Sequence, residues 1–132
     1  MKKVKIIIEK TEDMYSSYAE NVHGIYGGGL TVDEAKESII TAINILKSNN
    51  VRNNIPKILL GDYELVFRFD IESLLQYYKG MLSNPAIEKI TGINQKLIHQ
   101  YSKGLKKPRK KQLQKIEEGL HNLGRELLAI EL

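Results

Sequence analysis

The sequence predicts an α+β protein with two small domains: a β-β-β-α-β domain over residues 1–69 and an all-α domain over residues 70–132. Two patterns support this division. Strand-like alternation of apolar and polar side chains is confined to the first domain, whereas only helical spacing follows Asp70. The composition, 42% hydrophobic and 27% charged, is typical of folded domains, and 132 residues suffice for two small ones.

The N-terminal strands are predicted from alternation and turns. Apolar and charged side chains alternate over residues 3–9, as in a half-buried strand, and Ile7 breaks the alternation, which predicts partial cover of the second face. After a charged turn, the aromatic stretch 14–20 is expected to form a hairpin with the first strand. A short third strand near 25–26 is expected to end in a glycine turn at 27–29.

One helix and one further strand complete this domain. Thr31 and Glu34 form a capping-box pattern, and apolar residues then recur at spacings of three and four as far as Leu46. Residues 49–62 mix Asn, Pro and Gly and are expected to form a connection. Residues 63–69 have strand composition with their aromatic side chains on one side, so we expect them to join the sheet.

Four helices are expected after residue 69. The last carries a seam of Leu and Ile spaced by three and four, whose first half is expected to pack in the core and whose end, Leu127–Leu132, is expected to contact another copy of the chain. The expected helix starts are Asp70 as a cap, Asn84 as a cap with Pro85 in the first helical position, Asn94 as a cap, and Pro108.

The two middle helices have the spacing of a helix-turn-helix, whose second helix lies in a DNA major groove. Gly92 falls at the turn, and Ile87, Ile93 and Ile98 fall where such motifs bury side chains. Glu88 departs from the pattern, since a small residue usually stands there. We therefore expect this region to bind double-stranded DNA through the third helix.

The charge distribution supports the same expectation. Residues 1–62 carry eight basic and eight acidic side chains, whereas residues 63–132 carry twelve and eight, so the net charge of +4 belongs to the second half. The 28 residues between Glu88 and Glu117 hold nine Lys or Arg and no acidic residue. A local positive potential attracts phosphates, although a solvated charged face is the commoner origin of such a run.

Burial of Leu97, Ile98 and Tyr101 would leave a polar face on the third helix. Glutamine can bond adenine bidentately and lysine can reach guanine, whereas contacts with phosphates position the protein without reading sequence. The expected base-reading residues are Gln95, Lys96, His99 and Gln100. The expected phosphate contacts are Asn94, Lys103, Lys106, Lys107, Arg109, Lys110 and Lys111.

Several classes of protein are excluded or made improbable by composition. The chain has no cysteine, which excludes disulfides, thiolate metal sites and cysteine nucleophiles. Its histidines lack ligand spacing, so we expect no metal and no cofactor. No signal peptide and no apolar run of membrane-spanning length is recognisable, and we expect a cytoplasmic protein with no membrane partner.

A family resemblance rests on four features of the first half: the tyrosine-bearing stretch Tyr15–Glu20, the turn His23-Gly24-Ile25, the triple glycine at 27–29, and the helix start Thr31-Val32-Asp33-Glu34-Ala35. Together they resemble HicB-type antitoxins. The resemblance implies a small fold akin to a reduced ribonuclease H. The second half is similar to the Cro/phage-repressor class of helix-turn-helix domain, which many HicB proteins append.

The resemblance implies two activities. The first domain would bind and neutralise a HicA-type RNA-cleaving toxin of a type II toxin-antitoxin system, with Glu20, Asp33, Glu34 and Glu37 as candidate contacts. The second domain would form dimers and repress transcription of its own operon by sequence-specific operator binding. The alternative is a stand-alone dimeric helix-turn-helix repressor whose first domain senses a ligand or only dimerises.

A nuclease is the competing enzyme class, because the ribonuclease H fold is catalytic when converging carboxylates hold divalent metal. The acidic residues on or near the strands are expected at strand ends and turns rather than in the sheet interior, so we expect no enzyme. These residues are Glu9, Glu12, Asp13, Glu20 and Asp70.

Overall fold

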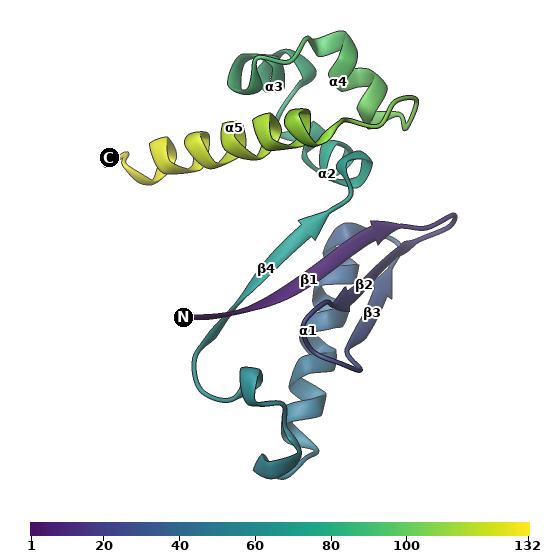
Figure 1. The fold of residues 1–132 in the computed structure, drawn as a ribbon, viewed down its shortest axis with the longest axis vertical. Helices are drawn as coiled ribbons and strands as arrows, with labels where there is room; N and C mark the ends of the chain where they lie inside the picture. Colours follow the sequence, from purple (N-terminus) through teal and green to yellow (C-terminus); the bar gives the residue numbers. More distant parts are fainter. The chain divides into compact units, whose positions relative to one another are not determined.

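The computed structural model describes residues 1–132, and the chain divides into two compact units, Met1–Ser73 and Leu74–Leu132. It is an α+β structure with one four-stranded mixed sheet and five α-helices, which confirms the predicted class (Figure 1). The first unit ends at residue 73 rather than 69. Asp70 stays with the sheet because its N–H donates to the Ile8 carbonyl at 3.3 Å and its carboxylate accepts from the Lys10 N–H at 3.2 Å.

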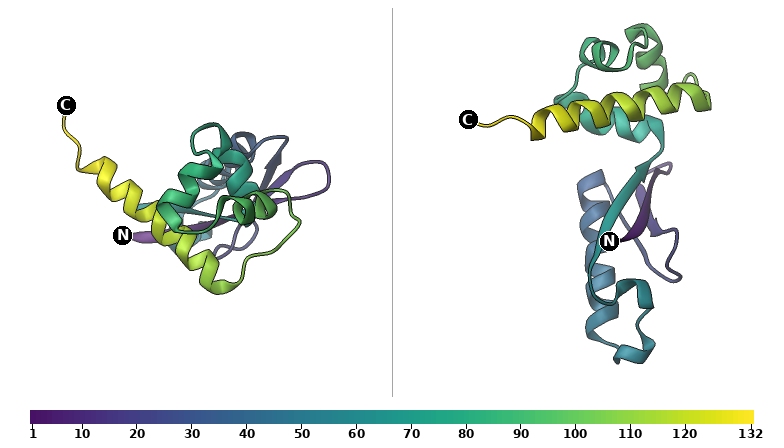
Figure 2. Two further views of the ribbon diagram at one scale, coloured as in Figure 1. Left: turned by 90° about the horizontal axis from the view of Figure 1, so that it is seen from above. Right: turned by 60° about the vertical axis from the view of Figure 1, so that its left-hand side comes forward.

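The sheet has the strand order β3-β2-β1-β4. Its β1 pairs antiparallel with β2 and parallel with β4, and β2 pairs antiparallel with β3. A single helix, α1, lies along one face of this sheet (Figures 1 and 2). The bounds are β1 Lys2–Lys10, β2 Tyr15–Ala19, β3 Tyr26–Gly29, β4 Tyr63–Phe69 and α1 Val32–Ser48.

The core of the first unit lies between the sheet and α1. Val4, Ile6 and Ile8 of β1 are fully buried, as is Ile39 of α1. Ile7 points to the other face and is also buried, which confirms that this face is partly covered by side chains. The predicted connection at 49–62 contains two short 3-10 turns, Arg52–Asn54 and Lys57–Leu59, and the second of these buries Leu59 completely.

The predicted capping box at the start of α1 is confirmed. The Thr31 hydroxyl accepts a hydrogen bond from the Glu34 N–H at 3.1 Å, and the Glu34 carboxylate accepts one from the Leu30 N–H at 2.7 Å. In the usual capping box the glutamate accepts from the N–H of the cap residue itself, whereas Glu34 accepts from Leu30, one residue before the cap Thr31. Two otherwise unpaired N–H groups near the helix start are satisfied in this way.

The prediction that residues 27–29 form only a turn is wrong, because all three glycines belong to β3. Gly27, Gly28 and Gly29 pair with Ser17, Ser16 and Tyr15 of β2. Glycine is needed here because α1 approaches closely: a Cβ on Gly29 would lie 2.3 Å from the Glu34 Cβ. A Cβ on Gly27 would be 2.9 Å from the Ile39 backbone nitrogen and would crowd two serine hydroxyls.

Four helices follow β4. Asp70 caps the first through the Ser73 N–H at 3.2 Å, and Asn94 caps the third through the Lys96 N–H at 2.8 Å, as predicted. The second is capped by Ser83 rather than Asn84, because the Ser83 hydroxyl accepts from the Ala86 N–H. The bounds are α2 Ile71–Tyr77, followed by a 3-10 turn at Tyr78–Gly80, then α3 Asn84–Thr91, α4 Gln95–Ser102 and α5 Lys110–Leu128.

Helices α3 and α4 are joined by a three-residue turn at 92–94. Gly92 has φ +75°, a left-handed conformation that favours glycine, and its N–H donates to the Glu88 carbonyl at 2.8 Å. Ile87, Ile93 and Ile98 are buried as predicted. The fixed turn and the shared apolar contacts hold the two helices together.

Helix α5 packs against α3 at its middle, where Ile116 and Gly119 are buried. Towards its C-terminal end the predicted apolar seam reaches the surface: Leu127 is 57% exposed and Ile130 is 59% exposed. The prediction of core packing for the first half of the seam is confirmed at Ile116, whereas Leu113 is 43% exposed.

Candidate nucleic-acid interface

The four residues predicted to read bases all lie on α4. Gln95, Lys96 and His99 are exposed, and Gln100 is half-buried. Inward-facing Ile98 and Tyr101 anchor the opposite side of the helix. Burial of this apolar side fixes the rotation of α4, so its polar side chains face outward as a set.

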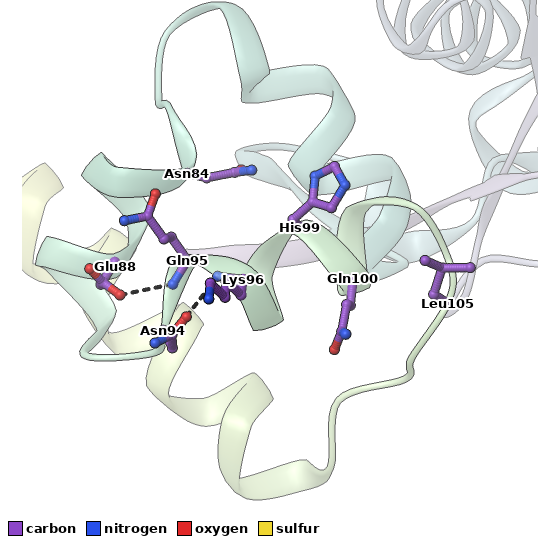
Figure 3. A pocket seen from close by; sticks show the side chains of 8 residues that line it. All are labelled: Asn84, Glu88, Asn94, Gln95, Lys96, His99, Gln100 and Leu105. Carbon is purple, nitrogen blue, oxygen red and sulfur yellow. Dashed lines mark hydrogen bonds between the residues drawn. The ribbon is translucent and has the colours of Figure 1, made fainter.

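These side chains line an open hollow of about 680 Å³ on the surface of the second unit (Figure 3). Three further residues border it that sequence reasoning did not assign to the interface: Asn84, Glu88 and Leu105. Asn84 was expected only as a helix cap. Leu105 is 74% exposed in the connection between α4 and α5. Its position among lysines was the only feature of the sequence that could have assigned it to the interface.

Glu88 has a structural role that explains its departure from the usual pattern. Its carboxylate accepts a hydrogen bond from the Gln95 N–H at 2.8 Å (Figure 3). Asn94 accepts from the next N–H, that of Lys96. The first turn of α4 is therefore fixed by two side chains, and a carboxylate near the positive end of the helix dipole is favourable. Asn94 was predicted both as this cap and as a phosphate contact, and its side-chain oxygen makes the capping bond.

The six predicted cationic phosphate contacts are all exposed and none forms an ion pair with a carboxylate. Arg109 precedes α5 without a side-chain capping bond, and the first turn of this helix contains no acidic residue. Cations at a helix N-terminus add to the positive end of the dipole. The segment consequently presents a concentrated positive potential. Its members are Lys103, Lys106, Lys107, Arg109, Lys110 and Lys111.

The acidic residues proposed to face a toxin have different environments in the first unit. Glu34 is committed to the cap of α1, and Glu20 lies 3.7 Å from Arg68 in an exposed ion pair. Glu20 also borders a second hollow, of about 410 Å³, between Tyr18 and Tyr26. Partial burial and the neighbouring carboxylates of Glu9 and Glu20 raise the pKa of the Tyr18 phenol.

No three His, Asp or Glu side chains come together in an arrangement that could hold a metal ion. The carboxylates considered for a nuclease, such as Glu9 and Glu20, lie on the sheet face that α1 does not cover or at strand ends. None of the helices has the length and apolar character that a bilayer span requires. Comparison of the chain with protein-family models, curated protein sequences and solved structures found no match.

Proposed function

We propose that this chain is the antitoxin of a type II toxin-antitoxin system, in which the second unit represses transcription of its own operon and the first neutralises a HicA-type RNA-cleaving toxin. In this proposal α3, the turn at Gly92 and α4 act as a helix-turn-helix of the Cro/phage-repressor class. The first unit, with its order of three strands, one helix and a fourth strand, acts as a reduced ribonuclease H-like domain without catalytic activity.

One observation supports the DNA-binding part: the outward-facing polar side chains of α4, of which only Gln100 is half-buried, and the exposed cations lie on two neighbouring segments of one unit. Gln95, Lys96 and Gln100 offer amide and ammonium groups of the kind that pair with base edges. The loop after α4 and the start of α5 offer unpaired cations to phosphates. A sequence-specific DNA-binding unit requires both kinds of group, one for base edges and one for phosphates.

The toxin-binding part rests on the HicB-like features of the first unit. The chain also differs in charge along its length, since residues 1–62 carry eight basic and eight acidic side chains and the net charge of +4 belongs to residues 63–132. This difference fits a first unit that binds a basic RNA-binding protein and a second unit that binds DNA. Glu20, beside the hollow at Tyr18, stands nearest to an accessible recess among the acidic candidates. We take it as the candidate contact with the best geometry.

The C-terminal end of α5 is proposed to contact a second copy of the chain. Leu127, Leu128 and Ile130 are exposed, and apolar side chains gathered at a helix end are favoured in a contact between copies. A dimer would bind two half-sites about one helical turn of DNA apart.

The runner-up function is a stand-alone dimeric repressor whose first unit senses a ligand or only dimerises. Such a repressor would use the same DNA-binding surface and would have no toxin partner. The open hollow beside Tyr18 and Tyr26 is the observation that favours a ligand. The two functions are separated by whether a neighbouring gene product binds the chain.

The salt dependence of DNA affinity tests the proposed phosphate contacts. Replacing Lys106 and Lys107 by Gln should lower the log–log slope of affinity against salt by about 0.9 per contact, because each contact releases condensed counterions. The affinity should fall equally for the DNA preceding the gene and for random duplex. Lys79 of the turn after α2 provides an exposed lysine outside the interface as a control. An unchanged slope would make both lysines ordinary surface charges.

A further inference from the structure

The sheet of the first unit has two edge strands, and they differ in accessibility. At one edge, β3 is short, and its outward-facing Gly28 N–H donates to the Ser38 hydroxyl at 3.1 Å. At the other edge, β4 has seven residues and pairs only with β1. It contains no proline, and its contacts with α1 (Figure 1) are made by side chains on one face of the strand, where the Lys36 and Lys47 ammonium groups lie over the Phe67 and Tyr63 rings. Long unprotected edges readily pair with another strand.

The backbone groups of β4 have a defined orientation. The Asp70 N–H, next after the strand, points towards β1, since it donates to the Ile8 carbonyl. Strand backbone groups point alternately to the two sides. The even-numbered residues 64, 66 and 68 therefore face β1, whereas the odd-numbered residues 63, 65 and 67 turn their N–H and C=O groups away from β1.

The sequence of β4 is complementary to itself in antiparallel orientation. With Val66 opposite Val66 of a second copy, Glu64 lies opposite Arg68 and Leu65 lies opposite Phe67. Each chain contributes both partners, so the pairing places two charge pairs on one face and two apolar pairs on the other. Opposite charges and apolar residues directly across an antiparallel pair are stabilising.

The hydrogen-bonding pattern fits the same register. Leu65 and Phe67 both direct their backbone groups outward, so Leu65 of one copy and Phe67 of the other form a hydrogen-bonded pair. Val66 then lies in a non-hydrogen-bonded pair, where side chains approach most closely. Val66 is 37% exposed, and the present partner of Arg68 is the exposed Glu20 at 3.7 Å. Such surface pairs contribute little and exchange readily.

We propose that β4 pairs antiparallel with β4 of a second copy of this chain, centred on Val66, to form a continuous eight-stranded sheet. This contact is separate from the one proposed for the end of α5. A chain with two such self-complementary surfaces assembles beyond the dimer. The partner is a second copy because the charges of β4 match those of its own reversed sequence.

A cysteine cross-link tests the register in the full-length chain, which has no cysteine of its own. In the proposed pairing, Val66→Cys places two thiols on Cα atoms about 4.5 Å apart, within reach of a disulfide. The matched control is Glu64→Cys, whose two copies would be about 13 Å apart at roughly 3.3 Å per residue. Mild oxidation should give covalent dimers of the first variant and not of the second. Equal cross-linking, or none in either, would overturn the proposal.

Charge reversal in the Val66→Cys background tests the complementarity. Glu64→Arg or Arg68→Glu alone should lower the rate of cross-linking by roughly tenfold, because like charges then face each other in both pairs. The two substitutions together should restore the rate, although they place Glu20 beside a second carboxylate within each chain. Far-ultraviolet circular dichroism establishes that each variant is folded. Failure of the double variant to recover would contradict pairing in this register.

Discussion

Gly119→Ala is expected to destabilise the helical unit by about 1–3 kcal/mol, the usual cost of inserting a methylene group into a packed core, and more if the backbone cannot move. A Cβ at this position would lie 2.5 Å from the Ile90 carbonyl oxygen and 3.1 Å from the Thr91 side chain. Glycine therefore lets α5 approach the last turn of α3. The clash is with backbone, so no side-chain rotation relieves it. Urea unfolding monitored by circular dichroism measures the change.

Gly124→Ala on the same helix is the matched control. No atom lies within 4 Å of a Cβ at this position, and alanine is favoured over glycine inside helices by about 1 kcal/mol. The two substitutions should therefore shift the urea midpoint in opposite directions. If both were stabilising, the close approach of α3 and α5 would be wrong. Because Ile90 and Thr91 precede the turn at Gly92, Gly119→Ala should also weaken DNA binding.

Replacing Gln95 or Gln100 by Ala should each weaken specific DNA binding by about 1–3 kcal/mol, roughly the discrimination that one bidentate contact with a base provides. Affinity for random duplex should change little, because phosphate contacts dominate non-specific binding. Binding to the DNA that precedes the gene, at one fixed salt concentration, measures the difference.

Gln114 of α5 is exposed and lies outside the hollow, so Gln114→Ala is the matched control and should leave both affinities unchanged. Parallel losses on specific and random DNA would assign Gln95 and Gln100 to phosphates instead. Equal affinity of the unaltered chain for both DNAs would remove the sequence-reading role altogether.

Local patterns were sufficient to predict much of the second unit. Gly92 at the turn, Asn94 as a cap and the buried Ile87, Ile93 and Ile98 follow from interactions within a few residues, which a sequence displays directly. The exposed face of α4 followed from the same periodicity. The α+β class was equally accessible, because the strand pattern and the helical pattern occupy separate parts of the chain.

Contacts between distant residues account for the errors. The glycines of β3 belong to a strand because Glu34 and Ile39 of α1 lie against them, a contact that turn propensity does not reveal. Asp70 joins the first unit through hydrogen bonds to β1.

The missing parts of the candidate interface have a similar origin. Ser83 and Asn84 are both residue types that cap helices, and the sequence does not show which of them precedes the first helical residue. Because Ser83 is the cap, Asn84 lies inside α3 and borders the hollow. Glu88 caps α4 across the turn, and Leu105 reaches the hollow from a loop, so neither role is visible in helical spacing.

RNA cleavage by the product of any small reading frame found next to the gene, measured with and without this chain, tests the antitoxin proposal most directly. A stable complex that abolishes cleavage is the predicted result. Gln95→Ala together with Gln100→Ala should inhibit equally well, because the proposed toxin contact lies in the first unit. Undiminished cleavage in the presence of excess chain, or the absence of a complex, would contradict the proposal and leave the stand-alone repressor.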